Sequence, residues 1–537
     1  MNILPYIKNK VSQYLHGPEN HNGSKVDIIT GDYNQYMDDV LPKHLFQQIK
    51  KGESRIICAP TGSGKTTALV SRIVALRKSI RVVYLVNRSM LALQIKAAIL
   101  RQNGIDTTAW PSDAIMAADL GNIMVMTYQA AAKYQDCFRS DTNDMVIICD
   151  EVHYLLNDAI FSFEPMMFYS MLQNSISYSK RIYISATISE VYTHILGMKQ
   201  GRLTKCYTMC ADNSHLRFRY YDYDNTNSMI DAVESVTANE EKAVVFVRNK
   251  KRGQELADRL SKSTFVYANM DDRGDLEEIA RTEQFSDSSI VSTRVLDNGV
   301  SITDEQIKHI IIEEIDPIAW IQMLGRIRRQ RNNPSPLTVW IPDYSRHHLN
   351  QMHRHYSEQL RLLEELGDDF LSFMERPERL QPWMLQTMNN KLQVNSLAIC
   401  KLRNMTDHLA YLIEEETHTP NAHIRFIRTM LQLEELSEKD FLDYDELENF
   451  RSHVTIAFTA FQDSPMLEAD RKVLEKALIN VVQKSNVYPK KITGTSIHLS
   501  SVNAILRFAG VDAEISELGK AYKVNNNTEG GNLNDES

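Results

Sequence analysis

The sequence contains few cysteines, no long apolar run and no excess of basic residues. Its six cysteines are scattered through 537 residues, and only Cys206 and Cys210 lie close together. No second cysteine or histidine pair at ligand spacing accompanies them, which argues against a zinc site and favours reduced thiols in a cytoplasmic protein. No apolar run approaches the roughly 18 residues that cross a bilayer. The N-terminus also lacks the apolar core and small-residue cleavage site of a secretory signal.

The charge balance bears on how the protein could bind nucleic acid. The chain has 60 lysine and arginine residues against 69 aspartate and glutamate residues, a formal net charge of -9. This argues against a protein that coats nucleic acid through bulk positive charge, although a local basic channel stays compatible with it. With 43% hydrophobic and 24% charged residues, the composition is that of a globular protein. The length favours about three domains.

Short β-rich segments alternate with helical stretches in two parts of the chain. RIICAP, RVVYLVN and MVIICD are examples, and several such runs are apolar through their centre, as expected of strands covered on both faces of a parallel sheet. The pattern restarts after about residue 215 with KAVVFVRN and HIIIEEI. From residue 346 to 490 the only glycine is Gly367, and helical spacing predominates. We therefore predict an α/β chain with two parallel-sheet lobes followed by a mainly α-helical C-terminal domain.

Changes of composition predict the domain boundaries. Residues 488–524 contain Lys490, Lys491 and a helix-like stretch closed by Gly510, which suits either a small winged-helix-like module or a capping segment. The final residues are polar and are expected to be disordered. The expected parts are an N-terminal lead-in (1–43), a first lobe (44–214), a second lobe (215–345), a helical accessory domain (346–487), the small segment (488–524) and a tail (525–537).

A glycine-rich segment, APTGSGKTT, follows the apolar RIIC and precedes the helical TALVSRIVALRK. Gly62 and Gly64 would let the backbone bend so that successive N–H groups point at phosphate oxygens, next to the positive end of the following helix. Lys65 would reach the β- and γ-phosphates of ATP, and the Thr66 hydroxyl would ligate Mg²⁺. The residues expected to bind the nucleotide here are Ala59, Pro60, Thr61, Gly62, Ser63, Gly64, Lys65, Thr66 and Thr67.

An acidic pair, Asp150 and Glu151, directly follows the apolar segment MVIIC. At the end of a strand in the same sheet, Asp150 could hold Mg²⁺ and Glu151 could polarise the attacking water as a general base. Two adjacent acids after a strand are more often a helix start when they occur alone. Their occurrence together with Lys65 predicts a nucleotide-hydrolysing site.

The segment QMLGRIRRQR is rich in arginine although the chain as a whole is acidic. On a helix, Gln322, Arg326 and Arg329 would recur at intervals of four and three residues and share one face. That face could point at the γ-phosphate, where Arg326 and Arg329 would stabilise the charge of the transition state. Arg328 and Arg331 fall off this face, and we expect them to face solvent or a nucleic-acid strand.

These segments occur in the order and at the spacing of motifs in superfamily 2 helicases. APTGSGKTT, DEVH, SAT (Ser185 to Thr187) and QMLGRIRR resemble the DExH group over roughly residues 44–345. The resemblance implies two RecA-like lobes with ATP and Mg²⁺ between them and nucleic acid crossing their top. It also implies that Ser185 and Thr187 link the γ-phosphate site to the strand-binding face, and that His153 couples motifs. Asp297 would sense the nucleotide from the second lobe, with an Asn-Gly turn as the alternative reading.

Six further residues lie in segments that resemble nucleic-acid-contacting motifs. They are Arg88, Thr127 and Gln129 in the first lobe and Arg248, Thr293 and Arg294 in the second. Contacts of this kind go to phosphates, which position a strand without reading its sequence. A solvated loop position is the alternative for each.

These features predict an ATP-dependent helicase or translocase. We expect it to act on a single strand or a duplex, and on DNA in preference to RNA because the DEAD-box pattern common in RNA remodelling is absent. One alternative is a nucleic-acid-stimulated ATPase that remodels RNA or protein–nucleic-acid complexes without processive unwinding. Another is a non-catalytic, nucleotide-gated binding scaffold, which the intact set of motif residues argues against. The helical C-terminal domain could guide the strand, bind a protein partner or pack against the lobes.

Overall fold

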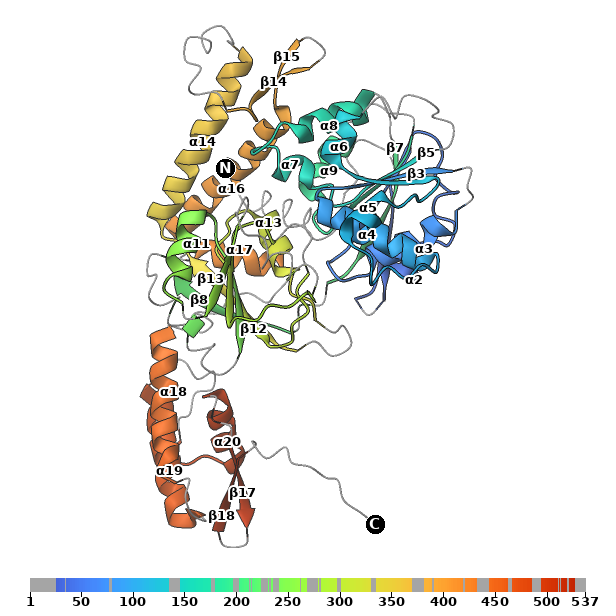
Figure 1. The fold of residues 1–537 in the computed structure, drawn as a ribbon. Helices are drawn as coiled ribbons and strands as arrows, with labels where there is room; N and C mark the ends of the chain where they lie inside the picture. Colours follow the sequence, from blue (N-terminus) through green and yellow to red (C-terminus); the bar gives the residue numbers. More distant parts are fainter. Residues whose placement is uncertain are drawn as a thin grey trace, which may run out of the picture. The chain divides into compact units, whose positions relative to one another are not determined.

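The computed structural model describes residues 26–526 with gaps. The gaps are residues 34, 77–79, 135–144, 175–178, 197–201, 212, 214, 224–229, 231–232, 235–240, 261, 268–278, 280–281, 297–300, 330–334, 369–380, 389–390, 419–420, 432–443, 462–465, 485–493, 510, 512 and 519–520. The chain divides into two compact units, one of residues 1–218 and 229–433 and the other of residues 219–228 and 434–537. Figure 1 shows the elements coloured along the chain.

The first lobe is built on a parallel sheet with the strand order β1-β7-β2-β6-β5-β3-β4. Its strands are β1 (Asp27–Gly31), β2 (Glu53–Cys58), β3 (Arg81–Val86), β4 (Ile123–Thr127), β5 (Met145–Cys149), β6 (Lys180–Ser185) and β7 (Arg202–Met209). Its helices are α2 (Met37–Val40), α3 (Lys65–Val74), α4 (Ser89–Gln102), α5 (Ser112–Ala117), α6 (Tyr128–Lys133), α7 (Tyr154–Asn157), α8 (Glu164–Asn174) and α9 (Ser189–Leu196).

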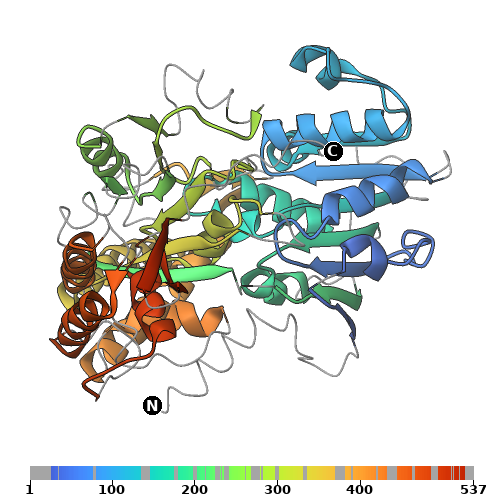
Figure 2. The same ribbon diagram turned by 90° about the horizontal axis from the view of Figure 1, so that it is seen from below.

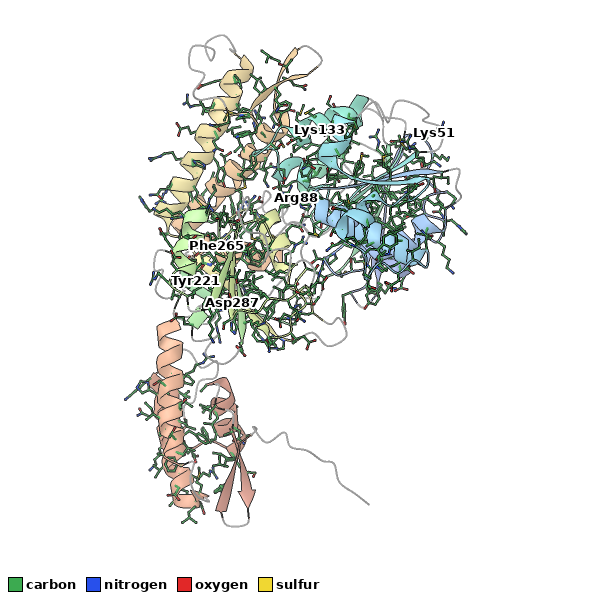
Figure 3. The ribbon with its side chains drawn as sticks, viewed as in Figure 1. Lys51, Arg88, Lys133, Tyr221, Phe265 and Asp287 are labelled. Atoms are coloured by element: carbon green, nitrogen blue, oxygen red, sulfur yellow. The ribbon has the colours of Figure 1, made fainter. Side chains whose placement is uncertain are left out.

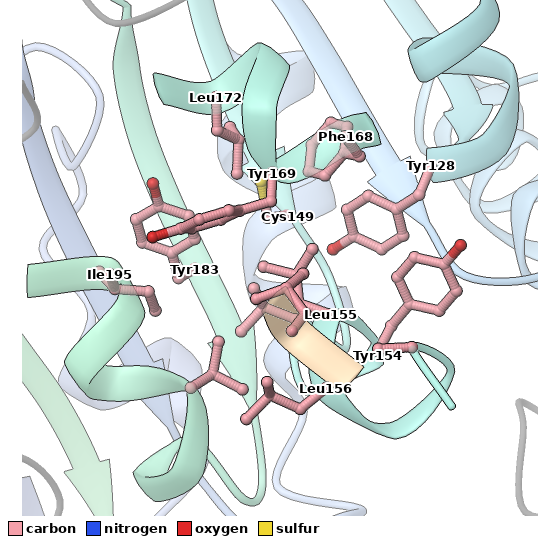
Figure 4. Close-up of a cluster of buried hydrophobic side chains, with 14 of the residues drawn as sticks. Tyr128, Cys149, Tyr154, Leu155, Leu156, Phe168, Tyr169, Leu172, Tyr183 and Ile195 are labelled. Atoms are coloured by element: carbon pink, nitrogen blue, oxygen red, sulfur yellow. The ribbon is translucent and has the colours of Figure 1, made fainter. Parts of the chain in front are cut away.

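Helices cover both faces of this sheet (Figures 1 and 2). Alternate residues of β3 belong to different hydrophobic clusters, with Val83 and Leu85 in one and Val82 and Tyr84 in the other. The first cluster contains side chains of α6 to α9, among them Tyr128 and Tyr154, whose rings stack at 4.9 Å (Figure 4). Burial on both faces explains why the strand is apolar throughout.

The start of the first lobe lies earlier in the chain than the sequence predicted. β1 and α2 fall within the expected lead-in, yet β1 pairs with β7 from Asp27 to Gly31. Most of β1 is exposed, as at the edge of a sheet, so the segment lacks the apolar run that marks the central strands.

The second lobe has its own sheet with the order β10-β11-β9-β12-β13-β8, and the pairings from β10 to β13 are parallel. Its strands are β8 (Leu216–Asp222), β9 (Lys242–Phe246), β10 (Ser263–Val266), β11 (Ser289–Ser292), β12 (Ile307–Ile312) and β13 (Leu337–Asp343). Helices α11 (Lys250–Ala257) and α13 (Pro317–Leu324) accompany it. The predicted fold class, two parallel-sheet lobes followed by a mainly helical region, is confirmed.

Helices α14 (Arg346–Asp368), α16 (Ser396–His418) and α17 (Ala422–Met430) complete the first unit, with the hairpin of β14 (Leu385–Met388) and β15 (Lys391–Val394) between α14 and α16. The second unit contains α18 (Tyr444–Thr459), β16 (Met466–Leu467), α19 (Glu468–Lys484), α20 (Leu499–Phe508), β17 (Ala513–Leu518) and β18 (Ala521–Asn526). Its three strands form an antiparallel sheet in the order β16-β18-β17. The predicted boundaries at residues 345 and 487, and the nature of segment 488–524, stay predictions.

In the described part of the chain, no helix combines the length and the apolar character needed to cross a bilayer.

Candidate nucleotide site

The glycine-rich segment forms a turn between β2 and α3, as the sequence predicted. Gly62 and Gly64 both have a φ of 79°, in the left-handed region that a β-carbon disfavours. Gly64 is the N-cap of α3 and offers no side-chain acceptor to the first N–H groups of the helix. These backbone donors are therefore available to an anion at the positive end of the helix.

Lys65 is the first residue of α3, and its side chain folds back onto the start of this turn. Its Nζ donates to the carbonyl oxygens of Ala59 at 2.7 Å and Pro60 at 2.9 Å. Burial lowers the pKa of Lys65, the charge of Glu151 acts in the opposite direction, and Arg328 lowers it further. Two cations, Lys65 and Arg328, and two acidic residues, Glu151 and Asp150, therefore lie close together around the turn.

The acidic pair follows β5 and faces α3 through a tyrosine. Tyr84 of β3 donates its hydroxyl to Oδ2 of Asp150 at 2.8 Å, and the same hydroxyl is hydrogen-bonded to Thr66. Thr66 and Asp150 thus share one small polar site, and their oxygens are of the kind that Mg²⁺ prefers. Burial raises the pKa of Asp150, and the neighbouring charge of Glu151 adds to that rise. Sequence reasoning missed Tyr84 because it lies in an otherwise apolar strand.

Glu151 adopts a left-handed backbone conformation with a φ of 50°, which is uncommon for a residue with a β-carbon. Its Oε2 lies 3.3 Å from Nδ1 of His153, and its Oε1 lies 3.9 Å from Nη2 of Arg326 in the second lobe. Burial opposes ionisation of Glu151, but His153, Arg326 and Lys65 together hold its pKa below the ordinary value. The side chain is therefore a carboxylate at neutral pH.

A closed series of contacts, which we call the inter-lobe ring, connects the two lobes. Its members, in order, are Glu151, His153, Ser185, Thr187, Gln322 and Arg326. All six side chains are buried or nearly so.

Two hydrogen bonds of the ring, His153 to Ser185 and Gln322 to Thr187, join residues far apart in the chain. Nδ1 of His153 lies 2.9 Å from Oγ of Ser185, and that oxygen lies 3.4 Å from Oγ1 of Thr187. Gln322 donates through Nε2 to Oγ1 of Thr187 at 3.2 Å, and its Oε1 accepts from Arg326 at 3.0 Å. The predicted coupling residues of the first lobe thus touch the predicted glutamine of the second.

The lobes also touch at the glycine-rich turn. A β-carbon added to Gly325 would lie 2.3 Å from Oγ1 of Thr61, closer than side chains can approach. Only glycine therefore allows α13 to end this close to the nucleotide turn.

The helical interpretation of QMLGRIRR is wrong beyond Leu324, where α13 ends. Ile327 instead forms a parallel bridge with Ile302, and the backbone N–H of Arg328 donates to the carbonyl of Ile302 at 2.8 Å. Pairing with this distant segment overrides the helical spacing. Successive side chains then alternate in direction, so Arg328 and Arg329 point different ways.

Arg328, expected to face solvent or a strand, instead faces the nucleotide turn. A β-carbon built on Gly62 would lie 3.2 Å from Nη1 of Arg328, and this nitrogen is buried without a hydrogen-bond partner among the described residues. Its Nε donates to Ser301 at 3.2 Å. Sequence reasoning missed Arg328 because it assumed a helix at this position.

Arg329, expected at the γ-phosphate, is bound within its own lobe. Its guanidinium donates to the carbonyl oxygen of Asp304 at 3.2 Å and to that of Ile307. The catalytic role of Arg329 stays a prediction that this arrangement does not favour. Asp297 and Arg331 lie outside the described residues.

Two of the three nucleic-acid candidates of the first lobe, Arg88 and Thr127, make contacts within that lobe. Arg88, labelled in Figure 3, precedes α4. It pairs with Asp158 at 2.9 Å. Thr127 caps α6 by accepting from the N–H of Ala130, and Gln129 is half-buried in the same helix. Their contact with a strand stays a prediction.

The three candidates of the second lobe lie at strand ends. Arg248 and Thr293 are half-buried and follow β9 and β11. Arg294 is 2.8 Å from Glu314 and 3.6 Å from Asp316. Arg294 is therefore held by carboxylates next to α13.

One family model matches a part of the chain that lies in the first lobe. Residues 32–190 match the family model described as the type III restriction enzyme, res subunit. A comparison with curated protein sequences gives no match.

Solved structures similar to this chain are distant in sequence. S. cerevisiae Dbp5 bound to RNA and ADP BeF3 has 13% identity, covers 54% of this chain and 80% of its own, and has a TM-score of 0.42. Mycobacterium smegmatis helicase Lhr bound to ssDNA and AMP-PNP has 14% identity, covers 85% of this chain and 53% of its own, and has a TM-score of 0.42. The DUF1998 helicase MrfA bound to DNA has 16% identity, covers 74% of this chain and 63% of its own, and has a TM-score of 0.44.

Removing the tyrosine hydroxyl should destabilise the acidic site. Tyr84→Phe leaves the buried Oδ2 of Asp150 without its donor, so we expect the free energy of unfolding to fall by about 1–3 kcal/mol. Tyr192→Phe is the matched control, because its hydroxyl is buried without a partner among the described residues. Urea denaturation followed by circular dichroism measures both. Equal effects of the two substitutions would contradict the assignment of Tyr84.

Proposed function

We propose that this chain, whose core is that of a superfamily 2 helicase, hydrolyses ATP between its lobes to move along a nucleic-acid strand. The observation that carries the proposal is that Lys65, Glu151 and Arg326 meet in one site although they come from distant segments and two lobes. A phosphate-binding cation, a carboxylate for water and a second cation are what phosphoryl transfer to water requires.

The first lobe would bind the nucleotide. The N–H groups at the start of α3 and the ammonium of Lys65 would receive the β- and γ-phosphates. Thr66 and Asp150 would hold Mg²⁺, which neutralises phosphate charge when it is bound. The hydroxyl of Tyr84 keeps these two side chains together.

Hydrolysis would follow from the charges around Glu151. Its carboxylate accepts a hydrogen bond from the attacking water, whose oxygen bonds to the γ-phosphorus as the bond to the bridging oxygen breaks. His153 and Arg326 keep Glu151 ionised for this task. Arg326 then balances the charge that develops on the phosphoryl oxygens, as an arginine finger does.

Arg328 is our proposal for the second cation from this lobe. Burial and the adjacent Arg326 lower its pKa to about 10, so it stays protonated at neutral pH. Its Nη1 beside Gly62 has no hydrogen-bond acceptor among the residues that the structure describes, and a nucleotide phosphate would supply one.

We propose DNA as the strand, on the sequence evidence that DEVH replaces the DEAD pattern common in RNA remodelling. A nucleic-acid-stimulated ATPase that remodels RNA or protein–nucleic-acid complexes is the second candidate, because the same ring would couple hydrolysis to lobe movement without unwinding. Strand displacement and ATP turnover, both measured with matched DNA and RNA strands, distinguish the two. A strand-binding scaffold without catalysis would give no turnover with any strand.

Loss of the lysine should abolish hydrolysis. Lys65→Ala removes the ammonium from the phosphate site, so we expect kcat to fall by at least about 100-fold. Release of inorganic phosphate, measured with and without strands, checks this. Wild-type turnover by the Lys65→Ala protein would refute the proposed function.

The two neighbouring arginines should behave differently. Arg328→Ala should lower kcat by at least about 100-fold, as the loss of an arginine that contacts transferring phosphate does. Arg329→Ala removes hydrogen bonds to backbone carbonyls of its own lobe. It should therefore lower the melting temperature more than Arg328→Ala does, and lower kcat less. Phosphate release and thermal unfolding of both variants give the ranking, and the reverse ranking would restore Arg329 as the phosphate contact.

A further inference from the structure

The first turns of helix α16 pack against the first lobe. The side chain of Asn395, just before the helix, donates to the carbonyl oxygens of Ala159 and Trp383, each at 2.9 Å. Leu397 and Leu402 belong to the same hydrophobic cluster as α6 to α9. The first turns of α16 are therefore fixed to the first lobe, although they follow the second lobe in the chain.

One turn into this helix, a buried lysine joins carboxylates from both lobes. Nζ of Lys401 lies 2.9 Å from Oε2 of Glu190 in α9 and 2.9 Å from Oδ2 of Asp316, which precedes α13. The three side chains are 0%, 8% and 1% exposed, respectively. Three charges held this far from water depend on one another, since removing one takes an opposite charge away from the others in a medium that solvates them poorly.

The two carboxylates occupy informative positions in the chain. Glu190 follows Thr187 by three residues, and Thr187 belongs to the inter-lobe ring. Asp316 caps α13 by accepting from the N–H of Ile318 at 3.1 Å, and α13 then carries Gln322. Lys401 thus contacts the two segments that carry the hydrogen bond between the lobes.

We propose that Lys401 is a positioning residue through which α16 holds α13 and the inter-lobe ring in the arrangement that hydrolysis needs. This inference rests on the proposed function only where kcat is the measurement. Lys401 touches no reacting atom. Lys401 acts through Asp316. Because α16 is anchored to the first lobe, Lys401 sets the position of Asp316 relative to that lobe.

Loss of the ammonium should disturb α13 more than it disturbs the nucleotide turn. Without Lys401, Glu190 and Asp316 face each other as buried carboxylates and repel. Asp316 retains Arg294 at 3.6 Å, a contact within the second lobe alone. The expected result is a second lobe whose α13 no longer keeps its place against the first lobe, while Lys65 and its turn stay intact.

The same helix offers a matched control. Arg403, two residues beyond Lys401, pairs with Glu364 of α14 at 2.7 Å, and these side chains are 61% and 40% exposed. An exposed ion pair within the helical region contributes little to stability and contacts neither lobe's motif segments.

The experiment compares Lys401→Met with Arg403→Met in the full chain. Lys401→Met should lower kcat by about tenfold or more, the size of effect expected from a coupled pair. Binding of a fluorescent ADP analogue should change much less, because the nucleotide turn is untouched. Arg403→Met should match the wild type in both measurements. A Lys401→Met protein with wild-type kcat overturns the inference, and so does an equal loss of nucleotide binding and kcat.

Asp316→Asn provides a second variant if Lys401→Met fails to fold. Asparagine still caps α13, and Lys401 keeps Glu190, so the protein should fold while kcat falls. Wild-type kcat in this variant also overturns the inference.

Hydrogen exchange keeps the inference separate from the proposed function. In the nucleotide-free protein, the amides of α13 should exchange faster in Lys401→Met than in Arg403→Met or the wild type. Absence of ATP hydrolysis in the wild type would refute the proposed function but not this result. Unchanged exchange in α13 would refute the role of Lys401 whatever the enzyme does.

Discussion

The hydrogen bond between Gln322 and Thr187 is the contact on which the candidate site depends. It is buried, and each partner has a second polar neighbour, Ser185 on one side and Arg326 on the other. A buried amide that loses its acceptor costs free energy, so the lobes are stabilised in the one arrangement that satisfies both. That arrangement also brings Arg326 to 3.9 Å from Glu151. The same arrangement of the lobes therefore forms the hydrogen bond between them and places Arg326 beside the charge of Glu151.

Charge explains why the site should respond to a nucleotide. Lys65, Arg326 and Arg328 lie near the turn together with the carboxyl groups of Glu151 and Asp150, and burial raises the free energy of every unbalanced charge. An anion between the lobes would relieve this imbalance and favour closure. On the proposed function, ATP is that anion. Its hydrolysis and the release of the products would weaken the contact between the lobes that Lys401 and the inter-lobe ring stabilise.

Local sequence encodes part of this site and not the rest. The glycine turn and the acidic pair were predictable because each depends on a few consecutive residues and on the strand before them. The end of α13 was not, because the bridge between Ile327 and Ile302 depends on a segment 25 residues earlier in the chain. Likewise Tyr84 reads as one more apolar strand residue until Thr66 and Asp150 are placed beside it. Lys401 lies in a helix whose spacing gives no sign that both lobes meet there.

On the proposed function, hydrolysis depends on the hydrogen bond between Gln322 and Thr187 that joins the lobes. A double-mutant cycle on kcat with Thr187→Val and Gln322→Ala tests it most directly, because the two side chains meet only through one hydrogen bond. If the bond acts as claimed, each single variant lowers kcat and the double variant is no slower than the slower single one. If the two losses instead multiply, the residues act independently and the claim is contradicted.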